Sequence, residues 1–108
     1  MRERPIFYVL NDAGEPVGVD GVLEWAQWFE TAERTVAYDE IGESSVSTVF
    51  LGLDPLFGFD ERAAPVLWET MIFGAELHRE RRRYATRDEA LKGHELAVAE
   101  LRRAHGER

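Results

Sequence analysis

One carboxylate stands inside a segment whose other residues predict a buried strand. Glu69 lies within residues 67–73, and strand alternation places it on the same face as Leu67, Met71 and Phe73. A charged group in apolar surroundings needs a partner. Glu69 therefore suits the part of a general base or of an acid that anchors a ligand. The alternative is a carboxylate on the open face of the sheet, or one paired with an arginine of residues 79–83.

A histidine occupies the centre of the apolar stripe of a predicted C-terminal helix. His94 is preceded by Gly93, which permits close approach of another part of the chain. An imidazole there can transfer protons, and with Glu69 and Asp54 it would form the acid–base set of a small hydrolase. The alternative is a buried structural histidine with hydrogen-bond partners. The histidines show no i, i+4 pairing, so the helical zinc-protease motif is absent.

Four arginines crowd residues 79–83, just before the predicted C-terminal helix. Guanidiniums beside the free amides of a helix N-terminus can hold a phosphate. On a strand, Arg79, Arg81 and Arg83 would share one face and Arg82 would point to the other. The alternative is a solvated strand that offsets the acidic first half of the chain. The predicted ligand-binding set is Arg79, Arg81, Arg83, Glu69 and His94.

Apolar side chains also fall where solvent exposure is expected. The loop over residues 54–65 carries Leu56, Phe57 and Phe59 between glycine and proline, and Trp28 lies at the edge of the apolar stripe of a predicted helix. Apolar residues in loops either fold back on the core or contact a partner. We interpret these four residues as an interface and expect a homo-oligomer.

Composition excludes several classes of function. The 108 residues contain no cysteine, which excludes disulfides and thiolate chemistry, and no common phosphate-loop, nucleophile or metal motif occurs. We predict no cofactor and no metal. The net charge is −8, so duplex nucleic acid is not the expected partner. The basic residues concentrate in residues 61–108, whereas residues 1–60 hold three basic and twelve acidic side chains.

The elements that must position these residues follow from hydrophobic periodicity. Helical spacing predicts helices over residues 22–33 and 87–104, the first capped by Asp20 and the second by a capping box from Thr86 to Glu89. Turn-forming residues occupy 11–16. Apolar and β-branched runs predict strands over residues 6–10, 35–41, 45–53 and 66–73, and residues 79–84 are an optional short edge strand.

The short connections between the later strands predict an antiparallel meander. We expect a single α+β domain over residues 1–108, with the order β-α-β-β-β-(β)-α and both helices packed on one face of the sheet. No apolar run is long enough to cross a membrane, and the N-terminus lacks the apolar stretch of a signal peptide. We therefore expect a cytoplasmic protein.

Several segments resemble a family of small proteins encoded by bacteriophages and prophages, for which no activity is established. The similar segments are residues 25–30 (WAQWFE), 47–54 (STVFLGLD), 67–74 (LWETMIFG) and 83–86 (RYAT), with the pairs Glu89–Ala90 and Gly93–His94. In the family pattern a histidine follows the aspartate equivalent to Asp54, whereas this chain has Pro55, which weakens an Asp-His catalytic or metal pair. The resemblance implies a role inside an infected bacterium.

These observations lead to an expectation of binding without catalysis. The leading hypothesis is a host-interaction or structural accessory protein that uses the aromatic loop and the acidic first half against a protein partner. The first alternative is sequestration of a small phosphorylated ligand, such as a nucleotide signal of host defence, by the arginines of residues 79–83. The second alternative is a small hydrolase that uses Glu69, Asp54 and His94.

Overall fold

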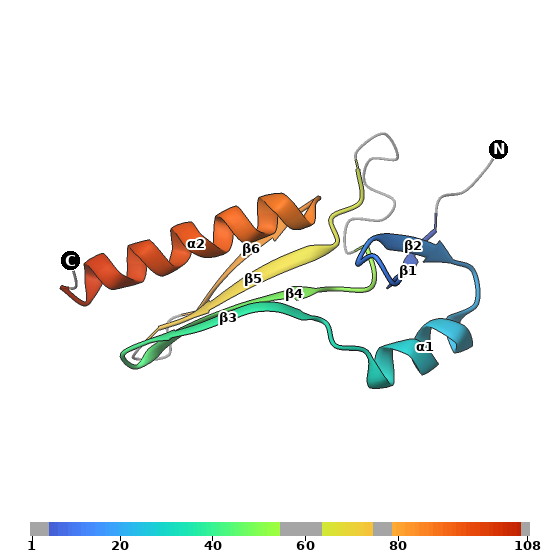
Figure 1. Ribbon diagram of the computed structural model, residues 1–108, viewed down its shortest axis with the longest axis horizontal. Helices are drawn as coiled ribbons and strands as arrows, with labels where there is room; N and C mark the ends of the chain where they lie inside the picture. Colours follow the sequence, from blue (N-terminus) through green and yellow to red (C-terminus); the bar gives the residue numbers. More distant parts are fainter. Residues whose placement is uncertain (1–4, 55–63, 75–78, 107–108) are drawn as a thin grey trace.

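The protein folds as an α+β domain built on an antiparallel sheet of four strands, β3-β4-β5-β6, with a separate hairpin β1-β2 (Figure 1). The computed structural model describes residues 5–54, 64–74 and 79–106. Each strand of the larger sheet pairs with the next along the chain, so the expected meander is confirmed. The elements are β1 Phe7–Leu10, β2 Pro16–Val19, α1 Val22–Thr31, β3 Thr35–Ile41, β4 Ser44–Phe50, β5 Trp68–Phe73, β6 Arg79–Tyr84 and α2 Arg87–Ala104.

The helix α2 lies across one face of this sheet, as expected (Figure 1). Its first turn is capped by Thr86, whose Oγ1 accepts a hydrogen bond of 3.1 Å from the amide of Glu89. Its inward residues, spaced three and four apart, are buried against every second residue of the strands. Two apolar clusters form this layer, one around Phe50 and Trp68 and one around Val46 and Ile72.

The predicted turn joins the two strands of the hairpin β1-β2, and it is shorter than expected, because β2 already begins at Pro16. The Oδ1 atom of Asn11 accepts hydrogen bonds of 2.9 Å from the amides of Ala13 and Glu15, and Gly14 has a φ of 78°. Because the turn closes by Glu15, residues 16–19 are free to pair with β1. The sequence analysis missed this second strand, since Pro16 and Gly18 are rare in strand interiors.

The helix α1 packs on this hairpin and not beside α2. The ring of Trp25 lies 4.9 Å from Phe7 of β1 and 4.8 Å from Phe29, so aromatic contacts tie α1 to β1. The predicted cap Asp20 is wrong: Gly21 is the N-cap and forms no side-chain cap bond. The α+β class, the antiparallel meander and the packing of α2 on the sheet are confirmed. The expectation that α1 shares the same face is wrong, because α1 packs on the hairpin and lies beyond the end of the sheet (Figure 1).

In the described part of the chain, neither helix has the length and apolar character needed to cross a bilayer.

Candidate functional site

The face of the sheet opposite α2 is the first candidate site, and we call it the open face. Side chains of the strands alternate, and Thr48 and Thr70 are fully buried on the α2 side, so their strand neighbours point the other way. Among the described residues, α2 covers the other face and α1 packs on the hairpin, so neither helix packs across this one. The open face consists of Tyr38, Glu40, Ser45, Ser47, Val49, Glu69, Met71, Phe73, Arg79, Arg81 and Arg83.

Apolar side chains cross the middle of the open face. Met71 is half-buried and is flanked in register by Ser47 and Arg81. Tyr38, which pairs with Ser47, is 54% exposed, and Phe73 is 38% exposed. The face therefore offers two accessible aromatic rings around one flexible thioether.

The arginines on the open face form its basic border along β6. All three are exposed, in contrast to their half-buried neighbours in the strand. Arg83 donates from Nε to Oε2 of Glu69 at 2.9 Å, and the guanidinium of Arg79 lies 5.8 Å from the centre of the Phe73 ring. Arg81, between them, forms no ion pair within the described residues. Four members of the predicted ligand-binding set therefore share the open face: Arg79, Arg81, Arg83 and Glu69. The pairing of Glu69 with Arg83 agrees with the interpretation of Glu69 as a carboxylate paired with an arginine of residues 79–83.

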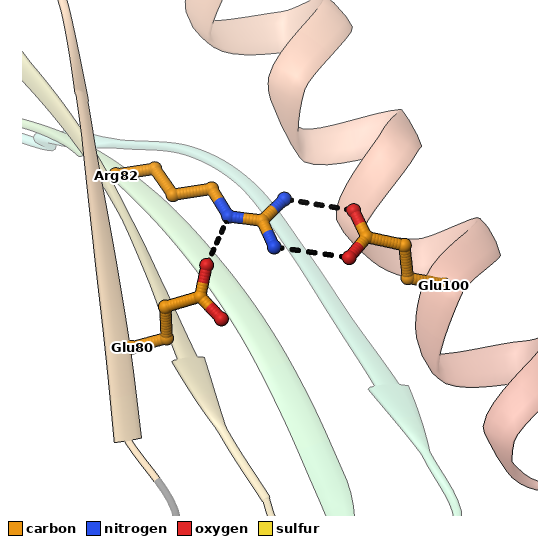
Figure 2. Close-up of polar contacts among 3 residues, drawn as sticks. All are labelled: Glu80, Arg82 and Glu100. Carbon is orange, nitrogen blue, oxygen red and sulfur yellow. Dashed lines mark hydrogen bonds and ion pairs between the residues drawn. The ribbon is translucent and has the colours of Figure 1, made fainter.

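Arg82 points to the opposite face, as strand alternation predicts. Its guanidinium binds both carboxylate oxygens of Glu100 on α2, at 2.9 and 3.0 Å, and its Nε binds Glu80 (Figure 2). The hydrogen bond to Glu100, and after it the one to Glu80, raises the pKa of Arg82. The hydrogen bond from Arg82 in turn lowers the pKa of Glu100. This arginine joins β6 to α2 and is not available to a ligand on the open face.

His94 belongs to α2, and its side chain points from the helix toward the face of the sheet opposite Glu69. Its Nδ1 is 2.8 Å from Oγ1 of Thr48, which is 2.6 Å from Oγ1 of Thr70, and its Nε2 is 2.8 Å from Oδ2 of Asp39. An ionised carboxylate only accepts, so Nε2 donates to Asp39. In a neutral imidazole Nδ1 then accepts from Thr48. The predicted ligand-binding set is therefore divided between two faces, and His94 and Glu69 do not share a site.

The Asp39–His94–Thr48 chain has the connectivity of a carboxylate, a base and a hydroxyl nucleophile. A neighbouring cleft of about 450 Å³, lined in part by Asp39, His94 and Arg102, lies between β3 and α2. Thr48, however, is 0% exposed, and its oxygen already contacts two partners, so no substrate atom can reach it. The geometry supports a buried structural network, which is the alternative stated above for His94.

The remaining predicted residues lie at the hairpin end of the protein or outside the described residues. Asp54 is buried, and its amide donates to the carbonyl of Ile6. Trp28 is half-buried and packs edge-on against Phe50, with ring centres 5.9 Å apart. The predicted interface residues Leu56, Phe57 and Phe59 lie outside the described residues.

A second apolar surface, which the sequence analysis did not identify, lies on α1 and the hairpin. None of the residues of α1 is buried, and Val22 and Leu23 are 58% and 69% exposed. Val17 on β2 and Ile6 add further exposed apolar area. The sequence contains one feature that could have predicted this surface, which is the width of the apolar stripe on α1. Val22, Leu23 and Ala26 extend the stripe beyond the side of the helix that carries Trp25 and Phe29.

No group of histidine, aspartate and glutamate side chains suited to a metal ion occurs within residues 5–54, 64–74 and 79–106. No protein-family model, curated protein or solved structure matches the chain.

Proposed function

We propose that the protein is a binding protein without catalytic activity, and that the open face of its sheet docks a protein partner. One observation carries this proposal: in the described residues a long helix covers one face of the sheet, whereas the other presents accessible aromatic side chains beside a row of exposed arginines. An exposed apolar patch bordered by polar side chains can mark a site of protein interaction.

The composition of the open face supports a protein as the partner. Tyrosine, phenylalanine, methionine and arginine are the residues enriched in the cores of protein interfaces, and tyrosine and arginine are frequent among those that dominate binding energy. Tyr38, Met71 and Arg81 lie in one row across the strands, joined through Ser47. Because Arg81 has no acidic partner within the described residues, the proposed partner supplies a carboxylate to it.

We further propose that this binding takes place inside an infected bacterial cell, and the resemblance of several segments to bacteriophage and prophage proteins supports this proposal. There the protein acts in the cytoplasm on a host protein or as a structural accessory. Its net charge of −8 disfavours a duplex nucleic acid as the partner.

A small phosphorylated ligand is the second candidate. The observation that favours it is the guanidinium of Arg81, which has no carboxylate partner in the part of the chain that the structure describes. Along a strand, residues two apart are separated by about 6.6 Å, so Arg79, Arg81 and Arg83 form a line and not a cup. Arg83 is also engaged by Glu69. This geometry suits an extended anionic surface better than a single phosphate.

Site-specific photo-crosslinking in bacterial cells tests the proposed docking face. A benzophenone amino acid is incorporated at position 38 in place of Tyr38, and at position 96 in place of Leu96 as a control on α2, since Leu96 is also exposed, at 64%. We expect a protein adduct at position 38 that Arg81→Glu reduces, and no such adduct at position 96. Equal labelling at both positions would contradict docking on the open face.

Calorimetric titration with linear and cyclic nucleotides tests the second candidate. Binding that Arg81→Glu abolishes and that Arg82→Glu leaves unchanged would favour the phosphorylated ligand, because only Arg81 of the two lies on the open face. Absence of heat at about 100 µM protein would eliminate every nucleotide tested, since affinities of about −5 to −6 kcal/mol register there.

A further inference from the structure

We propose that the partner is a second copy of this chain, and that α1 of each copy packs on the open face of the other. This inference rests on the proposed function, because it assigns an occupant to the same face. The two contacts are identical and are related by a two-fold axis, so the assembly closes as a dimer.

Both surfaces that meet in this dimer are incompletely packed within one copy. The ten residues of α1 include no buried side chain. Isolated helices of this length are marginal in water and depend on packing of their apolar face. The aromatic contacts of Trp25 secure one side of α1, which leaves Val22 and Leu23 on the exposed side. On the open face, Tyr38 and Phe73 are exposed in the same way.

The charges of the two surfaces are complementary. Residues 5–33, which form the hairpin and α1, contain six acidic and no basic side chains. The border of the open face along β6 carries three exposed arginines, of which only Arg83 is paired with a carboxylate within the described residues. Opposite potentials favour and orient association, and like potentials oppose it. Contact of α1 with α1 would bring two acidic surfaces together, and contact of two open faces would leave the apolar side of α1 uncovered.

The shape of one copy is consistent with exchange of α1. Figure 1 shows α1 beyond the end of the sheet, on the side away from α2, and connected to the sheet through β3. The radius of gyration is 15.6 Å, whereas about 13 Å is usual for a compact domain of this size. A helix held away from its own sheet is in a position to reach the sheet of a neighbour.

Sedimentation of matched variants tests the proposed dimer. We expect wild type to sediment at about 100 µM as twice the 12.4 kDa mass of one chain. Leu23→Glu and Arg81→Glu should each raise the dissociation constant by at least about 10-fold. The controls Leu96→Glu and Arg103→Glu change equally exposed residues on α2 and should leave it within about 2-fold. Circular dichroism of all four should match that of wild type at dilutions where wild type has itself dissociated, because no altered side chain is buried within one copy.

Mixing the two interface variants distinguishes the reciprocal contact from any symmetric one. A copy with Leu23→Glu keeps an intact open face, and a copy with Arg81→Glu keeps an intact α1, so the mixture restores one of the two contacts. We expect association between the two variants to be at least about 5-fold tighter than self-association of either. No gain on mixing, or loss of dimer with only one of the two substitutions, would overturn the exchange of α1.

The same experiments separate this inference from the proposed function. A monomeric wild type that still gives a position-38 adduct with a different protein would overturn the dimer and support the docking face. Labelling at position 38 no greater than at position 96, with a wild-type dimer that Arg81→Glu does not affect, would overturn both.

Discussion

Replacement of Thr48 by valine tests the buried network beneath α2. Thr48 is fully buried and touches Thr70 at 2.6 Å and His94 at 2.8 Å through one oxygen atom. Valine has nearly the same shape, so Thr48→Val removes the hydrogen bonds without opening a cavity. Two buried polar groups then lose a partner, at about 1–2 kcal/mol each, in the lower part of the usual range. We expect the free energy of unfolding to fall by about 2–4 kcal/mol.

Urea unfolding followed by tryptophan fluorescence measures this loss. With a urea dependence of about 2 kcal/mol per molar, the midpoint should fall by about 1–2 M. The matched control is Ser47→Ala, which removes a hydroxyl one position along β4 on the open face and should change stability by no more than about 0.5 kcal/mol. The double variant with Thr70→Val should lose less than the sum of the two single changes, because both ends of one hydrogen bond disappear together. A midpoint for Thr48→Val equal to that of wild type would refute the reasoning.

Three further changes probe α2 and its contacts. Thr86→Ala removes the cap of the helix and should cost about 1 kcal/mol, seen as a lower urea midpoint; an unchanged midpoint would mean that the helix does not depend on this cap. In Gly93→Ala, the added Cβ would lie 2.1 Å from Oη of Tyr84. The overpacking should cost about 1–3 kcal/mol, which exceeds the gain of about 1 kcal/mol in helix propensity, so the melting temperature should fall. A rise in melting temperature would be inconsistent with that contact. Glu100→Gln should reduce stability at pH 6 by no more than about 1 kcal/mol, because the side chain of Glu100 is 48% exposed where it pairs with Arg82. Arg82 lowers the pKa of Glu100, so this contribution is present above the ordinary carboxyl range and is lost as pH falls through the lowered pKa; a difference between variant and wild type that persists at pH 2 would contradict the pairing.

Local signals in the sequence were sufficient for the elements of the sheet and for α2. The β-branched run over residues 35–41 and the arginine-rich run over 79–84 form strands with the predicted bounds. Alternation along β6 also separated Arg82 from the other arginines correctly, because side-chain direction on a strand depends only on position. Thr86 caps α2 as predicted, since a cap requires only residues of the same turn.

The contacts between distant segments could not be obtained from the same signals. Periodicity identified the apolar stripe of α1, but it could not show which segment packs against that stripe. In the structure Trp25 of this stripe packs against Phe7 of the hairpin. His94 was recognised as a candidate, but its partner Asp39 is 55 positions away, and the sequence suggested Asp54 for an acid–base set. The pairing of Glu69 with an arginine of residues 79–83 was predicted as one structural interpretation, but Arg83 could not be singled out, because the choice depends on the register of β5 and β6.

The central claim is that the open face is a binding surface, and the methyl group of Met71 reports on it directly. The chain has two methionines, so selective ¹³C labelling of methionine methyl groups gives two signals, and Met71→Leu identifies the one from the open face. The account predicts that the Met71 signal shifts as protein concentration rises from about 10 to about 500 µM, and that Arg81→Glu suppresses the shift. A Met71 signal that keeps the same position over that range, in wild type and variant alike, and that does not change in a bacterial cell extract, would contradict the account.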